Sequence, residues 1–375
     1  MTLGIDATNI RSGGGLTHLK EIINEVNKSN SDFKKVFIWS NNKTLDELPI
    51  NDWLIKKTHS WLNKSNVFCF LYQIILLSKS AKKYNCDLLF VPGGSFLGFY
   101  KPFVTMSRNM LPFEREERNR FWWKMRLKLI ILKYIQTFTF KRSEGVIFLT
   151  EYARNYINSA INLKNDSIII PHGINLRFLN EPKEQIDIFN YSSENPFKLL
   201  YVSIVTAYKH QWNVAEAIVK LKNEGYPIKL DLVGSKTESF YLLQKVMEKD
   251  TFNVINYNGL IPYLELDEIY KEADAFVFAS SCENMPNILI EAMSAGLPIA
   301  CSNKGPMPEV LSDAGFYFNP TNVDEIYNAI KQMLDSSELR FRKALISYNR
   351  TKNYSWKDCS NETFKYLSEI SNKYS

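Results

Sequence analysis

The chain has 375 residues, of which 45% are hydrophobic and 23% charged, and its formal net charge is +6. This length suffices for two domains of ordinary size, and the apolar share excludes a disordered chain. The five cysteines are dispersed without CxxC spacing and there are four histidines, so we expect a reducing compartment and neither a disulfide scaffold nor a zinc site.

The chain alternates short apolar runs with helical stretches in two series. In the first, strands are predicted at residues 2–7, 36–40, 87–91, 103–106, 145–149 and 167–170. In the second, they are predicted at residues 199–205, 228–233, 254–257, 275–279 and 298–301. Such alternation predicts parallel, doubly wound sheets. We therefore expect an α/β protein with Rossmann-like domains at 1–180 and 198–353, a polar linker at 181–197 and a C-terminal helix at 354–375.

The chain shows no sign of a targeting or membrane-spanning segment. Residues 1–6 already have the pattern of a strand, so we expect no signal peptide. The longest early uncharged run, residues 65–78, is shorter than the roughly 20 residues that span a bilayer. We therefore expect a cytoplasmic protein.

The first predicted strand leads to three successive glycines, Gly13, Gly14 and Gly15. Glycines let backbone N–H groups approach a ligand closely, and a helix starting near Leu16 would offer its positive end to a phosphate. The spacing is not G-x-G-x-x-G, so a dinucleotide site is not indicated. A flexible turn is the alternative interpretation, and we expect His18 to pack on its helix rather than to act in catalysis.

Residues 115–142 are rich in basic and aromatic side chains. Arg120, Lys124 and Lys128 recur every fourth residue, which predicts a basic helical face. An apolar series with helical spacing accompanies them at Leu127, Ile130, Ile131 and Tyr134. Such a helix can lie on an anionic membrane surface, and the alternative is packing on the N-terminal sheet. We expect no nucleic-acid partner, because no RNA-binding module pattern is present.

The most informative segment, residues 281–293, contains Glu283 and Glu291. The apolar run before it predicts a buried parallel strand, and the helix after it ends at Gly296. One glutamate thus lies in a strand-to-helix loop and the other in the helix, near the carboxyl end of a strand where open α/β sheets bind ligands. Two carboxylates beside a helix N-terminus suit a nucleotide sugar, which has hydroxyls at both ends and phosphates between.

This segment resembles the Glu-x7-Glu motif of retaining GT-B glycosyltransferases, of the family 4-like, bacterial surface polysaccharide type. The resemblance continues through residues 296–302 and 305–309, and it covers the C-terminal half well and the N-terminal half loosely. It implies the GT-B fold, with two Rossmann-like doubly wound parallel-sheet domains facing across a cleft. It also implies that the C-terminal helix returns to the N-terminal domain.

The resemblance implies roles for individual residues. Glu291 would hold the ribose hydroxyls, and Glu283 would hold donor-sugar hydroxyls and stabilise positive charge at the anomeric carbon. Lys209 matches the lysine that offsets the diphosphate charge. The other donor-binding positions would be Gly14, Gly15, Asn284, Met285, Asn287, Gly234 and Gly259.

The chain departs from the family pattern at three places. Ser203 or Ile204 stands where family members carry a second cation, an arginine, and Pro286 removes an N–H group from the sugar-contacting loop. Arg108 and Asn109 stand where many members carry a His-Asp pair, and neither can be a general base. Asn109 could still hydrogen-bond the donor sugar as part of the catalytic site, and Arg108 could bind a phosphate or an acidic acceptor.

Residues and resemblance together predict a metal-independent hexosyltransferase without a cofactor. It would move sugar from a UDP- or GDP-linked donor to a glycan acceptor, expected to be lipid-linked, in bacterial O-antigen, capsule or lipopolysaccharide synthesis. Residues 115–142 would attach it to the inner face of the cytoplasmic membrane. Two alternatives stay open, a nucleotide-sugar 2-epimerase on the same fold and a non-catalytic glycan- or lipid-binding relic. The sequence does not indicate the nucleobase, sugar, acceptor, linkage or oligomeric state.

Overall fold

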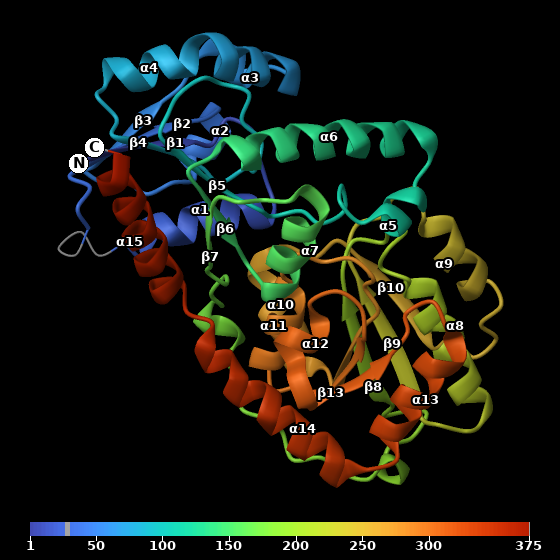
Figure 1. The fold of residues 1–375 in the computed structure, drawn as a ribbon. Coiled ribbons are helices and arrows are strands. Elements are labelled where there is room, and N and C mark those ends of the chain that lie inside the picture. Colours follow the sequence, from blue (N-terminus) through green and yellow to red (C-terminus); the bar gives the residue numbers. More distant parts are fainter. Residues whose placement is uncertain (27–30, 375) are drawn as a thin grey trace. The chain divides into compact units, whose positions relative to one another are not determined.

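The computed structural model describes residues 1–26 and 31–374, which form two compact units (Figure 1). Unit 1 comprises Met1–Phe113, Trp122–Gly173 and Tyr354–Ser375, and unit 2 comprises Glu114–Phe121 and Ile174–Asn353. Each unit is built on one sheet in which all the strand pairs are parallel. The predicted fold class, two Rossmann-like domains with doubly wound parallel sheets, is confirmed.

The sheet of unit 1 has seven strands in the order β3-β2-β1-β4-β5-β6-β7. Its central strands are wholly or largely buried, because helices cover both faces of a parallel sheet. The strand order changes direction between β1 and β4, so the carboxyl ends of these strands form a topological switch point where α/β sheets bind ligands. The strands are β1 (Thr2–Asp6), β2 (Lys35–Trp39), β3 (Leu54–Lys57), β4 (Leu88–Val91), β5 (Phe103–Met106), β6 (Gly145–Phe148) and β7 (Asp166–Ile169).

The sheet of unit 2 has six strands in the order β10-β9-β8-β11-β12-β13. Its switch point lies between β8 and β11, which pair through Ala275 with Leu199 and Phe276 with Leu200. The loops that follow these two strands therefore start side by side, at the carboxyl ends of the two strands. The strands are β8 (Phe197–Val202), β9 (Ile228–Val233), β10 (Ile255–Gly259), β11 (Ala275–Phe278), β12 (Ile299–Ser302) and β13 (Gly315–Phe318).

Helices lie on both sides of the sheet of unit 1, with α3 and α4 on one side and α1 and α15 on the other (Figure 1). The last helix, α15, is held against α1 by the Ser360 hydroxyl, which donates a 2.7 Å hydrogen bond to the Ile22 carbonyl. A π-helical turn, Gln73–Leu77, lies between α3 and α4. The helices are α1 (Gly14–Asn24), α2 (Asn42–Asp46), α3 (Asn66–Tyr72), α4 (Ser78–Lys83), α6 (Trp123–Arg142), α7 (Glu151–Ile161) and α15 (Trp356–Tyr374).

Unit 2 includes the stretch expected to be a linker, which is held by the fully buried Arg340. Its guanidinium donates to Gln185 Oε1 at 3.0 Å and to the Met333 carbonyl at 3.0 Å. The short helix α5 also belongs to unit 2, although the sequence predicts it within the N-terminal domain. The helices of unit 2 are α5 (Arg115–Asn119), α8 (Gln211–Asn223), α9 (Phe240–Met247), α10 (Leu266–Glu272), α11 (Asn287–Ser294), α12 (Met307–Leu311), α13 (Val323–Leu334) and α14 (Ser337–Arg350).

Helix α6 carries three of the four residues of its apolar series on the surface, and the fourth, Ile130, is partly buried. Leu127 is 50% exposed, Ile131 51% and Tyr134 71%, so these side chains do not pack into the sheet of unit 1. Lys124 and Lys128 are also exposed on α6. Arg120, predicted on the same basic face, precedes the helix and forms an ion pair within unit 2. No helix among the described residues is long and apolar enough to cross a membrane.

Candidate functional site

The residues expected to handle the donor lie at the switch point of unit 2. Lys209 lies in the loop between β8 and α8, and Glu283 lies in the loop between β11 and α11. Glu291 lies within α11. The fold thus brings two of the predicted residues, from loops far apart in the sequence, to neighbouring strand ends.

Lys209 and Glu283 form an ion pair between Nζ and Oε1. The same carboxylate oxygen accepts a 2.6 Å hydrogen bond from the Ser280 hydroxyl. Only 4% of Lys209 is exposed, and its ammonium group lies 4.8 Å from the ring centroid of Phe278. Ion pairs and cation–π contacts are stronger where water is excluded, so the charge of Lys209 is held in place before any ligand binds.

Tyr201, a fully buried residue of β8, ties the two loops together. Its hydroxyl donates a hydrogen bond to the Lys209 carbonyl and accepts one of 3.2 Å from the Ala279 N–H group. Burial raises the pKa of the Tyr201 phenol well above its ordinary value, so the phenol stays protonated and able to donate. The Lys209 backbone is therefore fixed from the β11 side as well as from β8.

A second set of contacts reaches the same loops from α5. The Ser281 hydroxyl donates a 2.6 Å hydrogen bond to Glu117 Oε2, and His210 Nε2 lies 2.9 Å from that hydroxyl. Arg120 pairs with the same Glu117 oxygen at 2.8 Å. Burial, together with the smaller effect of the charge of Arg120, lowers the pKa of His210 to about 4, so the imidazole is neutral. This arrangement, which we call the α5 brace, consists of Glu117, Arg120, His210 and Ser281.

Glu291 is a buried residue, 5% exposed, and not a solvated helix position. Burial raises the pKa of its carboxyl to about 7, while hydrogen bonds from Tyr270 and Tyr263 and the charge of Arg177 favour the ionised form. The Tyr270 hydroxyl donates to Oε2 at 3.1 Å. The Arg177 guanidinium lies 4.2 Å from the ring centroid of Tyr263. A carboxylate in such surroundings can accept strong hydrogen bonds from ligand hydroxyls.

The loop before α11 is largely closed. Asn284 and Met285 are buried, and the helix begins at Asn287, directly after Pro286. The Asn287 N–H group donates to the Met285 carbonyl at 3.1 Å. This amide is therefore engaged within the loop in the absence of a ligand.

Gly234 and Gly259 differ from each other. Gly234 has a φ of 147°, and a Cβ built on it would lie 1.9 Å from the Ser203 carbonyl oxygen, so only glycine fits there. Its N–H group donates to the Gly259 carbonyl at 2.8 Å. Gly259 has a φ of 71° and open space beside it. Gly234 is thus required by the close approach of two strand ends, whereas Gly259 leaves room for a ligand.

The remaining predicted residues, Gly14, Gly15 and Asn109, belong to unit 1. Helix α1 begins at Gly14, and a Cβ built on Gly15 would lie 2.7 Å from an Arg108 guanidinium nitrogen. Asn109 is exposed, and its Oδ1 accepts a 3.1 Å hydrogen bond from the Leu111 N–H group. His18 is buried with its ring 4.8 Å from that of His172, so it packs against a residue outside its own helix. Sequence reasoning found the glycine loop but not the approach of Arg108 to it.

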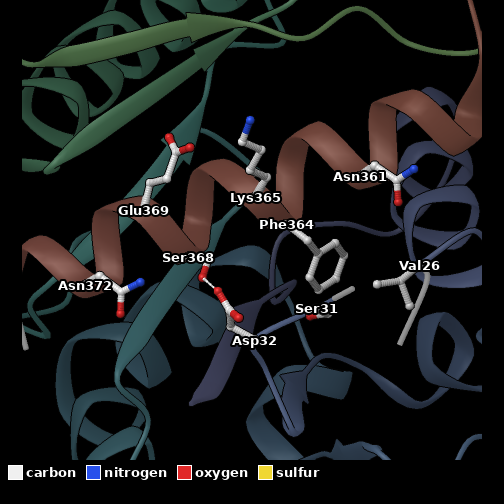
Figure 2. Close-up of a pocket in the computed structure, with 9 residues that line it drawn as sticks. All are labelled: Val26, Ser31, Asp32, Asn361, Phe364, Lys365, Ser368, Glu369 and Asn372. Carbon is white, nitrogen blue, oxygen red and sulfur yellow. Dashed lines mark hydrogen bonds between the residues drawn. The ribbon is translucent and has the colours of Figure 1, made fainter. Parts of the chain in front are cut away.

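Two further observations concern a hollow in unit 1 and groups that could hold a metal ion. A hollow of about 460 Å³ between α15 and the chain around Asp32 (Figure 2) is lined by none of the predicted site residues. Its walls include Phe364, Lys365 and Glu369. In the part of the chain that the structure describes, no group of three or more His, Cys, Asp or Glu residues is placed to hold a metal ion.

The sequence of the second unit matches a known family. Residues 183–352 match the family described as "Glycosyl transferases group 1". The O-antigen chain mannosyltransferase B of Escherichia coli is 36% identical over 109 residues, so the chain spans only 29% of the length of that curated relative. The match confirms the resemblance drawn from the segment that contains Glu283 and Glu291.

Two solved structures share the fold over nearly the whole chain. Sucrose-phosphate synthase from Thermosynechococcus elongatus superposes with a TM-score of 0.75 at 15% identity, covering 99% of each chain. HepE from Anabaena, solved in complex with UDP and glucose, superposes with a TM-score of 0.69 at 15% identity, covering 98% of this chain and 100% of that one. Similarity at this identity establishes the GT-B fold.

Proposed function

We propose that this chain, whose residues 183–352 belong to the group 1 glycosyl transferases, moves a hexose from a nucleoside-diphosphate sugar to a glycan acceptor with retention of anomeric configuration. The observation that carries the proposal is the ion pair between Lys209 and Glu283 at the switch point, with the buried Glu291 in the helix that follows. UDP bound to a structure of the same fold supports a nucleotide donor.

Each residue has a role that its surroundings support. Lys209 offsets negative charge on the departing diphosphate. Because its ammonium group is already fixed in a site that excludes water, it does not have to move during the reaction. Glu283 accepts hydrogen bonds from the donor-sugar hydroxyls and stabilises the positive charge that develops at the anomeric carbon. Glu291 accepts hydrogen bonds from the ribose hydroxyls, and its carboxyl must be ionised to do so. These side chains suffice for the proposed charge stabilisation, so we propose that transfer needs no metal ion.

The missing arginine weakens phosphate binding but does not abolish it. Ser203 is buried, and its hydroxyl has no hydrogen-bond partner among the described residues. A hydroxyl at this position can donate one neutral hydrogen bond to a phosphate oxygen, which is weaker than the bidentate contact of an arginine. Lys209 would then carry most of the electrostatic stabilisation within unit 2.

The surface of α6 supports a lipid-linked acceptor on the inner face of the cytoplasmic membrane. Exposed apolar side chains and the lysines Lys124 and Lys128 lie on one helix, which is the composition of a surface that binds anionic lipid. The similarity to an O-antigen chain mannosyltransferase supports an acceptor in bacterial surface polysaccharide synthesis.

A nucleotide panel tests the proposed function. UDP, GDP and their hexose conjugates are added to the full chain, and the shift in unfolding temperature reports binding, since a ligand of the native state stabilises it by mass action. Reaction mixtures containing the best donor are then followed by NMR. Release of nucleoside diphosphate and a new glycoside support transfer. Conversion of the donor to its 2-epimer, or binding without any reaction, would contradict it in favour of an epimerase or a non-catalytic relic.

A further inference from the structure

Unit 1 contains a hollow of about 390 Å³ at the amino ends of three neighbouring strands. Lys101 precedes β5, Ser143 and Glu144 precede β6, and Lys164 precedes β7. The last residues of α6 and of α15 complete the walls. The hollow therefore lies at the end of the sheet opposite to the carboxyl ends of the strands, and it is separate from the switch point of this sheet.

Basic side chains dominate this hollow, which we call the basic hollow. They are Lys101, Lys141, Arg142, Lys164 and Lys373. The two carboxylates that line it are already paired, because Lys101 Nζ lies 2.9 Å from Glu144 Oε1 and Lys373 Nζ lies 2.8 Å from Asp166 Oδ2. Lys141 and Lys164 are exposed, and neither forms an ion pair with another described residue. Their charges are therefore accessible to an anion and uncompensated.

Helix α6 ends at the basic hollow, and the partial negative charge of a helix C-terminus opposes the binding of an anion. The side chain of Asn165 reduces this effect. Its amide group donates to the Phe140 carbonyl at 3.0 Å and also to the Ser143 carbonyl. Carbonyl groups at this end of α6 are thus engaged within the unit, and the excess of basic side chains determines the sign of the charge in the hollow.

An exposed phenylalanine is held beside the basic hollow. Phe99 is 71% exposed, although its N–H group donates to the Ser78 hydroxyl at 3.1 Å and the carbonyl of Gly98 accepts a 3.0 Å hydrogen bond from Arg142. The Arg142 guanidinium carbon lies 5.9 Å from the ring centroid of Phe99 and 4.6 Å from that of Phe138. The backbone at Phe99 is therefore fixed on both sides, while its ring is left in contact with solvent.

An exposed apolar stripe on α6 leads to the same point. Its residues are Leu127, Ile131, Tyr134 and Phe138, and each is at least 48% exposed. They follow helical spacing, so they lie along one face of the helix. Because Phe138 and Phe99 both contact Arg142, the stripe continues to the rim of the basic hollow. Aromatic rings beside lysines are typical of surfaces that enter the head-group layer of an anionic membrane.

We propose that the basic hollow binds the phosphate head group of an anionic phospholipid, with Lys141 and Lys164 pairing with the phosphate and the Phe99 ring entering the interfacial layer. The proposal rests on the membrane attachment in the proposed function. A soluble phosphate compound offers the same charge but nothing to the apolar stripe, so we infer a lipid as the source.

The proposed site would also orient unit 1 on the bilayer. Lys124 lies near the start of α6 and Lys141 near its end. At 1.5 Å per residue they are about 25 Å apart along the helix. Contacts with lipid at both ends of α6 would hold the helix along the membrane surface, whereas one contact would leave it free to tilt.

Cosedimentation of the full chain with vesicles that contain phosphatidylglycerol tests the site. Lys141→Ser with Lys164→Ser should weaken binding at least about tenfold, because two charges that pair with head groups are lost. Lys245→Ser with Lys249→Ser removes the same charge from exposed positions of unit 2 and is the matched control. Equal weakening by the two pairs would mean that binding follows net charge alone, and it would overturn the proposal.

A fluorescent label shows whether residue 99 enters the bilayer. All five native cysteines are buried, so a bimane probe reacts selectively with the Phe99→Cys variant. Its emission should shift to shorter wavelength when vesicles are added. Phe189→Cys, at a phenylalanine of unit 2 that is 90% exposed, is the control and should show no shift. A probe at residue 99 that stays in water while the protein is bound to vesicles would contradict the proposal.

Soluble anions distinguish a lipid site from a general phosphate site. Inorganic phosphate and glycerol 3-phosphate are titrated by calorimetry into the wild type and into the Lys141→Ser, Lys164→Ser variant. We expect neither anion to bind more tightly than on the order of 1 mM, because exposed ion pairs alone contribute little. Tighter binding of inorganic phosphate that the variant loses would identify a site for soluble anions and overturn the lipid assignment.

Two comparisons separate this proposal from the proposed function. Lys124→Ser with Lys128→Ser tests attachment through α6 itself. If that pair weakens vesicle binding and Lys141→Ser with Lys164→Ser does not, the assignment of the basic hollow alone fails. The second pair is expected to release nucleoside diphosphate from the donor like the wild type. If it weakens vesicle binding but the wild type releases no nucleotide from any donor, the basic hollow is supported and the transfer reaction fails.

Discussion

At the residue scale, the site depends on charges that are buried before any ligand is present. Lys209 is almost fully buried against Glu283, and each is the other's compensating charge. Glu291 is buried with two tyrosines and the charge of Arg177 for support. Stability and function are therefore coupled at these positions, and substitutions should show both effects.

Replacing one partner of the ion pair should destabilise the protein more than replacing both partners. Lys209→Met leaves the Glu283 charge without its partner, and we expect a loss of about 3 kcal/mol in the free energy of unfolding. The double variant Lys209→Met, Glu283→Gln should recover at least 1 kcal/mol of that loss. Urea unfolding of both variants and of the Glu283→Gln single variant measures the coupling energy. Additive losses would contradict the pairing.

Glu291 should make nucleotide binding dependent on pH. Its folded-state pKa of about 7 lies above the ordinary value of 4.5, so the folded protein holds this proton in the window between them. The stability that this proton contributes is present below about pH 4.5 and is lost as the pH rises through 7. Ribose hydroxyls prefer the carboxylate, so nucleotide affinity should rise as the pH increases from 6 to 8.

Calorimetric titrations at pH 6, 7 and 8 measure this dependence. Glu291→Gln should bind nucleotide about tenfold more weakly at pH 8, from the loss of a charged hydrogen bond, and should show a flatter pH profile. Glu283→Gln should retain the wild-type profile, since it leaves the titrating group intact. A wild-type affinity that falls between pH 6 and 8 would mean that the neutral carboxyl is the binding form.

Local motifs predict residues that the chain itself places next to one another, and they miss partners from elsewhere. Glu283 and Glu291 share one strand–loop–helix segment, so their spacing and flanking residues identified them. Glu117 lies 164 positions from Ser281, and Tyr201 lies 78 positions from Ala279. No pattern around Glu117 or Tyr201 indicates these contacts, because they exist only after the sheet order has brought the loops together.

At the element scale, the short helix α5 supports the loops of the site although it is remote in sequence. The α5 brace holds Ser281, two residues before Glu283, and His210, one residue after Lys209. His210 has a φ of 50°, a conformation that few non-glycine residues adopt, and its hydrogen bond to Ser281 helps to maintain it. We infer that Glu117 positions both functional loops without touching a ligand.

Removing the brace should lower turnover more than nucleotide binding. Glu117→Ala frees the Ser281 hydroxyl, and a small displacement of the reacting groups can cost on the order of 100-fold in rate. We expect kcat to fall at least tenfold while nucleotide affinity, which depends on Glu291, changes less than threefold. Glu116→Ala, at an exposed position of the same helix, is the matched control. Equal activity of the two variants would leave Glu117 without a positioning role.

Helix α6 should attach the protein to anionic membranes. Lys124→Ser with Lys128→Ser removes two exposed charges, each contributing about 1 kcal/mol near an anionic surface, so vesicle binding should weaken roughly 30-fold. The pair Lys245→Ser with Lys249→Ser removes exposed charges of the same spacing elsewhere and should have little effect. Cosedimentation with vesicles containing phosphatidylglycerol measures both. Wild-type protein that stays in solution at low salt would exclude α6 as a membrane surface.

At the scale of the whole molecule, alternation of strands and helices was sufficient to predict two parallel sheets. The strands that were missed, β3 and β13, lie at sheet edges. β3 contains two lysines and is only partly buried, so it lacks the apolar run of a central strand. The assignment of residues 114–121 to unit 2 follows from long-range contacts and has no counterpart in local sequence.

A cavity of about 360 Å³ in unit 1 illustrates the same limit at the scale of a domain. The sequence indicated Arg108 and Asn109 as departures from the family pattern, and the structure places both at this cavity. Gln73 and Gln136, which also line it, were not indicated, because an isolated glutamine in a helix carries no local signal. Only the assembled unit shows that both side chains are buried there.

Donor turnover in the presence of EDTA tests the central claim most directly. The full chain is incubated with the donor selected by the nucleotide panel, with excess EDTA, and release of nucleoside diphosphate is measured for the wild type, Glu283→Gln and the exposed control Glu216→Gln. We predict that the wild type and Glu216→Gln release nucleotide at equal rates with and without EDTA. Glu283→Gln should be at least 100-fold slower, about 2.7 kcal/mol in transition-state stabilisation, with donor affinity kept. Loss of wild-type activity on chelation that Mg²⁺ or Mn²⁺ restores, or full activity of Glu283→Gln, would contradict the account.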